Sequence, residues 1–234
     1  MVASPLLTSL HGGQLWRGQP EAPPRAPFLS SGLSALDAVL ALGGLPLGGV
    51  TEVRAGLGQG GLSLAMHICA QVLREPHQRV AVVDGPGMLH GPAVLEAGVP
   101  PGRLWCVRPQ EPGRVISLGL KIIRSAAFRL VVVDHAQGPP SSQPELQVRR
   151  LAVAAQEAGC AVVLLCGTWA DQAALPLPGA LRLRLQRQAR DRVVVQVEKQ
   201  RGSSLAQRAE LAWPLWDNPS SQPDLDHALP VGGE

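Results

Sequence analysis

Short apolar runs alternate with helical patterns through the middle of this 234-residue chain. The apolar runs cover residues 50–54, 79–84, 104–107, 130–134 and 160–166. The helical patterns cover residues 62–73, 89–97, 115–126 and 145–158. Nearly continuous apolar strands that alternate with helices are typical of a parallel sheet covered by helices on both faces. We therefore predict an α/β fold with a mostly parallel sheet.

The pattern changes after residue 180. Residues 181–185 and 193–197 flank a polar, arginine-rich turn, which predicts an antiparallel hairpin appended to the parallel sheet. Residues 208–211 add a further short strand to this prediction. Near the start, Ser34 and Asp37 have the spacing of a capping box, so we expect a short helix there that continues to Leu40.

The chain is predicted to have three parts. Residues 1–28 form an N-terminal arm, because prolines at positions 20, 23, 24 and 27 prevent regular structure in its second half. Residues 29–211 form the core domain. Residues 212–234 are rich in Pro, Ser, Asp and Gly and are predicted to be a disordered C-terminal tail.

Composition excludes several classes of protein. Apolar residues make up 45% of the chain and charged residues 17%, which excludes wholesale disorder. With two Phe and no Tyr, the chain cannot build a broad base-stacking surface. The net charge of +3 is mild, so binding to nucleic acid would need a local basic patch.

The four cysteines indicate a reducing compartment. They lie in apolar contexts without a C-x-x-C pair, so we expect buried free thiols. No secretion signal or membrane span is visible, and we expect a cytoplasmic protein that makes no contact with membranes. Six histidines are scattered without metal-ligand spacing. His67 is expected in the core and His135 at a strand end.

A glycine-rich loop between a predicted strand and a predicted helix is the first candidate site. A phosphate-binding P-loop reads G-x-x-x-x-G-K-[ST]; its amides cradle phosphate, its lysine neutralises the outer phosphates and its hydroxyl holds magnesium. The frame here is intact, but Leu62 stands where the lysine belongs. A plain glycine-rich turn is the alternative. The candidate residues are Gly56, Gly58, Gly60, Gly61, Leu62 and Ser63.

A second candidate element follows further along the chain. Residues 130–134 are four apolar residues ending in Asp134, as in a Walker B strand, whose acid contacts magnesium-bound water. The alternative is a core strand closed by a helix-capping aspartate. Together, in this order, the two segments predict a P-loop-type fold.

Several segments resemble the RecA core. Residues 29–37 read LSSGLSALD and residues 43–52 read GGLPLGGVTE. The likeness continues through 82–84, 96–99 and 130–134 to a hairpin that ends at 198–201, so it spans residues 29–211. The resemblance implies a RecA-like P-loop core, with a mostly parallel sheet flanked by helices and an antiparallel C-terminal hairpin.

Within the RecA superfamily, the chain is most similar to the ImuA family, degenerate RecA-like proteins of bacterial mutagenesis cassettes. Four further segments support this resemblance through their order and spacing. They are LWRG at 15–18, RLWCVRP at 103–109, LRLRL at 181–185 and KQRG at 199–202.

The departures from active RecA proteins concern catalysis. Leu62 removes the lysine, and Gly85-Pro86-Gly87 stands where RecA has a water-activating glutamate. Residues 166–168 replace the stretch with the glutamine that senses the γ-phosphate. Because phosphoryl transfer depends largely on electrostatic stabilisation, we predict a non-catalytic scaffold without a cofactor. Weak ATP binding through the loop amides stays open.

The predicted hairpin is the third candidate site. Arg182 and Arg184 alternate with leucines, so the arginines share one face of the strand. Such a face can track a DNA backbone, or dock an acidic partner or a neighbouring subunit; a solvated outer face is the alternative. Residues 168–179 lie where RecA has a DNA-binding loop but are short, with only Trp169 for stacking. The basic candidates are Arg182, Arg184, Arg187, Arg190, Arg192, Lys199 and Arg201.

Trp213 and Trp216 flank Pro214 where the predicted tail begins. Two tryptophans on a flexible segment are candidate anchors for a partner groove. The alternative is that they pack back on their own domain.

The resemblance implies a non-catalytic accessory or scaffold protein of error-prone translesion DNA synthesis in the bacterial SOS response. Its expected partners are an ImuB-type Y-family-like polymerase subunit and an error-prone C-family DNA polymerase, with RecA and single-stranded DNA as further contacts. One alternative is a DNA-stimulated ATPase or recombination mediator, in which Lys121 or Arg124 replaces the missing lysine. The other is a cell-division inhibitor like SulA that binds FtsZ.

Overall fold

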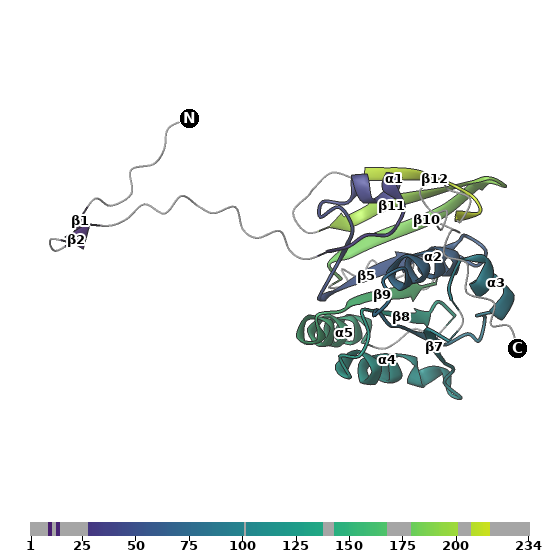
Figure 1. Ribbon diagram of the computed structural model, residues 1–234, viewed down its shortest axis with the longest axis horizontal. Coiled ribbons are helices and arrows are strands. Elements are labelled where there is room, and N and C mark those ends of the chain that lie inside the picture. The colour runs from purple at the N-terminus through teal and green to yellow at the C-terminus, as the bar shows by residue number, and fades with distance from the viewer. Residues whose placement is uncertain are drawn as a thin grey trace, which may run out of the picture.

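The computed structural model describes residues 9–10, 13–14, 28–100, 102–137, 143–167, 179–200 and 207–215. Its main body is a twisted sheet with helices on both faces (Figure 1). The sheet has eight strands in the order β12-β11-β10-β5-β9-β8-β6-β7. The strands from β10 to β7 pair in parallel, whereas β10, β11 and β12 pair with one another antiparallel. The predicted fold class is confirmed.

The parallel strands are β5 (Gly49–Arg54), β6 (Val80–Asp84), β7 (Leu104–Val107), β8 (Leu130–His135) and β9 (Ala161–Cys166). The antiparallel part consists of β10 (Leu181–Ala189), β11 (Arg192–Gln200) and β12 (Gln207–Ala212). Two small antiparallel pairs stand apart from this sheet: β1 (Ser9–Leu10) with β2 (Gly13–Gln14), and β3 (Phe28–Leu29) with β4 (Leu45–Pro46).

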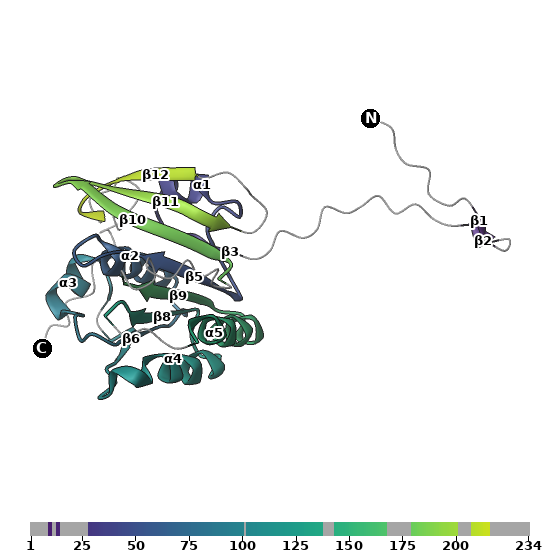
Figure 2. The same cartoon turned by 180° about the vertical axis from the view of Figure 1, so that it is seen from behind.

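The helices are α1 (Ser34–Val39), α2 (Gly61–Leu73), α3 (Gly91–Glu96), α4 (Val115–Arg124) and α5 (Pro144–Ala158), with a 3₁₀ turn at Pro112–Arg114. Both ribbon views place α4 and α5 together, away from the antiparallel strands (Figures 1 and 2). Their apolar residues, among them Val115 and Leu151, pack on one face of the parallel strands. No helix in the described ranges is long and apolar enough to cross a membrane.

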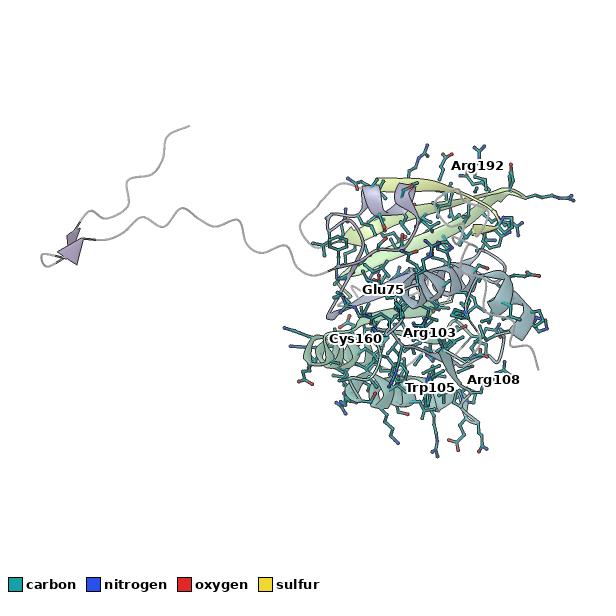
Figure 3. All side chains as sticks on the ribbon, in the orientation of Figure 1. Glu75, Arg103, Trp105, Arg108, Cys160 and Arg192 are labelled. Carbon is teal, nitrogen blue, oxygen red and sulfur yellow. The ribbon has the colours of Figure 1, made fainter. Side chains whose placement is uncertain are left out.

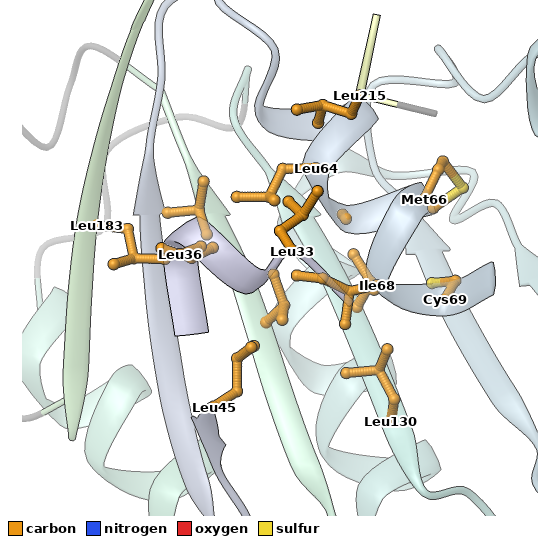
Figure 4. Packing of buried hydrophobic residues seen from close by; sticks show 14 of the residues in the cluster. Leu33, Leu36, Leu45, Leu64, Met66, Ile68, Cys69, Leu130, Leu183 and Leu215 are labelled. Carbon is orange, nitrogen blue, oxygen red and sulfur yellow. The ribbon is translucent and has the colours of Figure 1, made fainter. Parts of the chain in front are cut away.

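The other face of the sheet carries the larger core. It joins α1 and α2 to both the parallel strands and the hairpin, with Leu36, Ile68 and Leu183 among its fully buried side chains (Figure 4). Leu215 is also fully buried in this cluster. The packed core therefore runs through Leu215, beyond the predicted domain boundary at residue 211.

Two local predictions are wrong. Ser34 and Asp37 do not form a capping box, because the N-cap of α1 is Leu33 and no side chain caps the helix. The Asp37 carboxylate instead accepts hydrogen bonds from the hydroxyl of Ser30 at 2.6 Å and the N–H of Ser31 at 3.0 Å. This fixes the turn that leads into the helix.

The second error concerns Cys106, which is exposed because β7 is an edge strand of the sheet. Its neighbour Trp105 is 60% exposed and makes an edge-on contact with Phe128, with ring centroids 6.0 Å apart. Cys69, Cys160 and Cys166 are buried as expected, and burial raises the pKa of the Cys160 thiol to about 11.

The hairpin strands are longer than predicted. The regular pairing of β10 and β11 continues through the arginine-rich segment as far as Ala189 and Arg192, with irregularities in register on the way. The predicted strand at 208–211 is confirmed as β12. The extra length brings the far end of the hairpin to the carboxyl end of β5, where the glycine-rich loop begins.

Candidate functional site

The glycine-rich loop joins the carboxyl end of β5 to the first turn of α2. Gly58 and Gly60 have φ angles of +74° and +96°, a region that side-chain-bearing residues rarely adopt. A Cβ on Gly61 would lie 2.9 Å from the Cβ of Ala55. These three glycines are therefore required by backbone geometry, and the loop presents its amides at the start of a 13-residue helix.

A pocket of about 480 Å³ opens at this loop. Asp134 at the end of β8 and residues 165–167 at the end of β9 form its other walls. The structure thus brings together all seven residues that the sequence predicted for this site: Gly56, Gly58, Gly60, Gly61, Leu62, Ser63 and Asp134. A crevice outside the carboxyl ends of parallel strands is where open α/β sheets bind their ligands.

Asp134 is the only carboxylate among the described residues that line the pocket, and its side chain is nearly buried. Burial raises the pKa of its carboxyl to about 6; the N–H of Ala136 opposes this rise and nearby Asp84 adds to it. Asp84 itself stabilises the turn that follows β6, because its carboxylate accepts hydrogen bonds from the N–H groups of Met88 at 2.9 Å and Leu89 at 3.1 Å. It is also paired with Arg108 at 2.9 Å.

The hairpin and the residues after β12 close one side of the pocket. The Trp213 ring lies against Gly60, where an added Cβ would come within 2.7 Å of it. The Arg187 guanidinium lies 4.9 Å from the centroid of the Trp213 ring, a cation–π geometry. The backbone N–H of Arg187 donates to the side-chain oxygen of Gln59 at 2.7 Å. Trp213 thus packs on its own domain, the alternative that the sequence left open.

Comparison with known proteins identifies the family to which this chain belongs. The model of the RecA N-terminal domain matches residues 17–156. The chain belongs to the RecA N-terminal domain family. The match confirms the resemblance to RecA that the sequence showed. The matched region contains both the glycine-rich loop and the strand that ends in Asp134.

Individual RecA proteins show the same relationship. The mitochondrial DNA repair protein recA homolog 3 of Arabidopsis thaliana is 31% identical over 123 residues, which is 53% of this chain and 28% of that protein. Protein RecA of Chlorobium chlorochromatii is 33% identical over 106 residues, 45% of this chain and 30% of the relative. Protein RecA of Halalkalibacterium halodurans is 30% identical over 122 residues, 52% of this chain and 35% of the relative. The chain therefore matches about a third of the length of these relatives.

Two glycines at which this RecA-family chain departs from the expected motifs are constrained by close packing. Pro86 lines the pocket, and Gly85 touches the backbone carbonyl of Asp134 so closely that a Cβ there would overlap it. Gly167 is equally close to the carbonyl of Ala136. Side chains at these two glycines would require the loops to move.

Sequence reasoning missed the cation that the structure places in the pocket. Arg187 is the one cationic residue among the described residues that line it. Lys121 and Arg124 do not line it; they lie in the last turns of α4, whose first residue, Val115, is the one near Gly85. The sequence identified Arg187 only as a basic residue of the hairpin and gave no signal that it lies at the pocket, because its position depends on the length and register of the hairpin.

The basic residues of the hairpin fall into two groups: Arg182 and Arg184 pair with carboxylates of the sheet, and the others that the structure describes lie on the surface. Arg182 lies 2.9 Å from Glu52, and their side chains are 12% and 0% exposed. Arg184 pairs with Glu198, which also lies 3.7 Å from Arg54. The predicted common face of Arg182 and Arg184 is present, but both arginines neutralise carboxylates of the sheet.

The other basic candidates lie farther out. Arg187, Arg190 and Lys199 are exposed, and Arg192 makes a surface pair with Glu210 at 3.5 Å (Figure 3). Arg201 and Trp216 lie outside the described residues. A role of this surface in binding DNA or a partner stays a prediction.

Proposed function

We propose that this RecA-family chain is a non-catalytic accessory protein of error-prone translesion DNA synthesis in the bacterial SOS response, of the ImuA type. It would bind an ImuB-type polymerase subunit and act with an error-prone C-family polymerase, RecA and single-stranded DNA. The observation that carries the proposal is Leu62 in the first turn of α2, at the position of the P-loop lysine.

The pocket supports binding without turnover. If a nucleotide entered it, the amides of the glycine-rich loop would face the phosphates, and Ser63 and Asp134 would hold the magnesium ion. The magnesium ion supplies charge neutralisation. The chain lacks the lysine, and Pro86 offers no proton acceptor in the pocket. Both losses raise the barrier to phosphoryl transfer more than they weaken ground-state binding through amides.

ATP turnover by the purified chain, with and without single-stranded DNA, tests the non-catalytic part of this proposal. We expect no turnover above the level of an Asp134→Ala variant, which controls for contaminating enzymes. Leu62→Lys is the informative comparison, because it restores the cation but not the base. Turnover that DNA stimulates and that Asp134→Ala abolishes would contradict the proposal.

Binding to an ImuB-type subunit from the same organism tests the accessory part. We expect a stable complex in a titration followed by calorimetry. If the two purified proteins do not bind at micromolar concentration, the accessory role fails even when turnover is absent.

Arg187 favours a second candidate, a DNA-stimulated ATPase. Its guanidinium lines the pocket and is held over Trp213, so it is placed to supply positive charge from the hairpin. Under this alternative, Arg187→Ala abolishes turnover, whereas Arg114→Ala, a change at an exposed arginine outside the hairpin, leaves it intact. Under the main proposal neither variant changes a rate that is already absent.

A further inference from the structure

A second cavity lies at the opposite end of the sheet from the nucleotide-type pocket. This amino-end groove has a volume of about 610 Å³ and is formed by the segment before β5, the starts of β5 and β10, and α5. Leu42, Pro46 and Leu47 contribute apolar walls from the segment before β5. Because these residues precede β5 and the glycine-rich loop follows it, the two cavities are separated by the length of the strand.

Helix α5 extends the apolar surface of the groove. Leu146, Arg149 and Val153 follow the i, i+3, i+7 spacing of one helix face, and Leu146 and Val153 are 41% and 49% exposed. The buried face of the same helix is a separate set of residues that packs on the sheet: Val148, Leu151, Ala154 and Ala155. The helix therefore has a second stripe, in which two apolar side chains on either side of Arg149 are only about half buried.

The charged side chains among the described residues that line the groove are all positive. Arg129 and Arg149 line it, and no Asp or Glu occurs among the described residues that line it. Glu145 and Glu157, the two acidic residues of α5, are not among them. A segment that enters this groove would gain from carboxylates and lose from lysine or arginine.

Gln200 adds a hydrogen-bond donor for which the described residues supply no acceptor. It lines the groove, and its side-chain oxygen accepts the N–H of Ala41 at 2.8 Å. Among the described residues, no hydrogen-bond acceptor is found for its buried Nε2. Since buried polar groups are normally satisfied, this amide calls for an acceptor such as a peptide carbonyl or a carboxylate.

We propose that the amino-end groove is the docking site for an acidic, aliphatic segment of the ImuB-type subunit. Leucine- or valine-sized side chains of this segment fill the groove beside Val153, and its carboxylates face Arg129 and Arg149. This inference rests on the proposed function, because it assigns a site to the partner named there.

Titration of the ImuB-type subunit against surface variants of the full chain tests the site. Val153→Asp places a carboxylate in the apolar stripe, and Arg149→Glu reverses the charge of the groove. Each is expected to weaken binding about tenfold or more, as substitutions at the centre of an interface do. The matched controls are Leu95→Asp on α3, which is 55% exposed, and Arg150→Glu, the exposed neighbour of Arg149 that does not line the groove. Both controls are expected to bind like the wild type.

The outcomes separate the two proposals. If the wild type binds but the groove variants bind equally well, the docking site is wrong and the accessory function stands. If the wild type itself does not bind, the accessory function fails and the docking site fails with it. Circular dichroism of each variant confirms that these surface changes leave the fold intact.

Hydrogen exchange gives an independent readout. Adding the subunit is expected to slow exchange in residues 41–50 and 146–156, without slowing it in residues 91–96 of α3. Protection confined to the hairpin or to the segments outside the described residues would overturn the assignment, because a different surface would then carry the contact.

Discussion

Strand β5 has a cavity at each end, and the charged side chains that line the two cavities differ. At the carboxyl end, backbone geometry shapes the pocket, since Gly58 and Gly60 adopt positive φ angles and Gly61 packs against Ala55. At the amino end, Gly48 and Gly159 also adopt positive φ angles, of +68° and +63°. The described lining residues of this groove include two arginines and no Asp or Glu, whereas those of the pocket include Asp134 and Arg187.

The glycine frame of the carboxyl-end pocket allows the side chains around it to differ from the P-loop pattern without a change of fold. The loop conformation depends on glycines, so replacing lysine by Leu62 alters the charge of the pocket without altering its frame. Leu62 even packs against the main core cluster. The amino-end groove also contains glycines with positive φ angles, and Val153 and Arg149 are the side chains that we expect to govern the docking proposed there.

A buried ion pair joins β5, the strand between the two cavities, to the hairpin, and breaking it is expected to have the largest effect. Glu52 in the middle of β5 is fully buried, pairs with Arg182 and accepts the N–H of Gly179 at 3.0 Å. Glu52→Ala removes the fully buried carboxylate of this pair, and breaking a buried pair costs about 3–5 kcal/mol in the free energy of unfolding. Urea denaturation measures this loss. A change below 1 kcal/mol would show that the hairpin is not anchored through Glu52.

Leu215 tests whether the carboxyl-end pocket needs the residues after β12. Leu215→Ala removes a fully buried side chain from the main core and is expected to cost about 3 kcal/mol. A chain that ends at residue 216 retains Leu215 and Trp213, so it is expected to unfold at the same urea concentration as the full chain. If truncation at residue 216 is as destabilising as Leu215→Ala, the domain boundary lies further along the chain.

Sequence patterns predicted the parallel sheet, the hairpin and the seven pocket residues because these depend on local signals. Apolar runs define buried strands, and the glycines of the loop are read directly from their positions. The fold of residues 50–166 is therefore visible in the sequence.

The contacts that the sequence did not reveal depend on tertiary register. Arg187 reaches the pocket only because β10 continues past the predicted strand end, and Glu52 meets Arg182 only because β5 pairs with β10. Cys106 is exposed because β7 is the last strand of the sheet, which its apolar neighbours do not disclose. The amino-end groove joins residues from five parts of the chain and has no sequence signature.

The protonation of Asp134 sharpens the contrast between the two cavities, because the amino-end groove has no carboxylate among its described lining residues. Burial raises the pKa of Asp134 from 3.8 to about 6, so the folded state binds this proton more tightly than the unfolded state does. The resulting penalty is absent below pH 4, develops between pH 4 and 6 and is complete above pH 6, where it is about 2–3 kcal/mol. Asp134→Asn is therefore expected to stabilise the protein at pH 8 but not at pH 4. Equal effects of the substitution at both pH values would contradict the raised pKa.

Arg192 carries the smallest expected effect on stability and tests whether the hairpin adds a third functional surface. Its pair with Glu210 spans 3.5 Å between side chains that are 55% and 46% exposed, so Arg192→Ala is expected to change the free energy of unfolding by less than about 1 kcal/mol. If the hairpin contacts a DNA backbone, the same substitution lowers affinity for single-stranded DNA and reduces the slope of log K against log salt by about 0.7. The matched control is Arg114→Ala, which breaks an exposed pair with Glu111 at 2.9 Å outside the hairpin and is expected to leave both quantities unchanged. Equal loss of DNA affinity in the two variants would mean that net charge, and not the hairpin, governs the interaction.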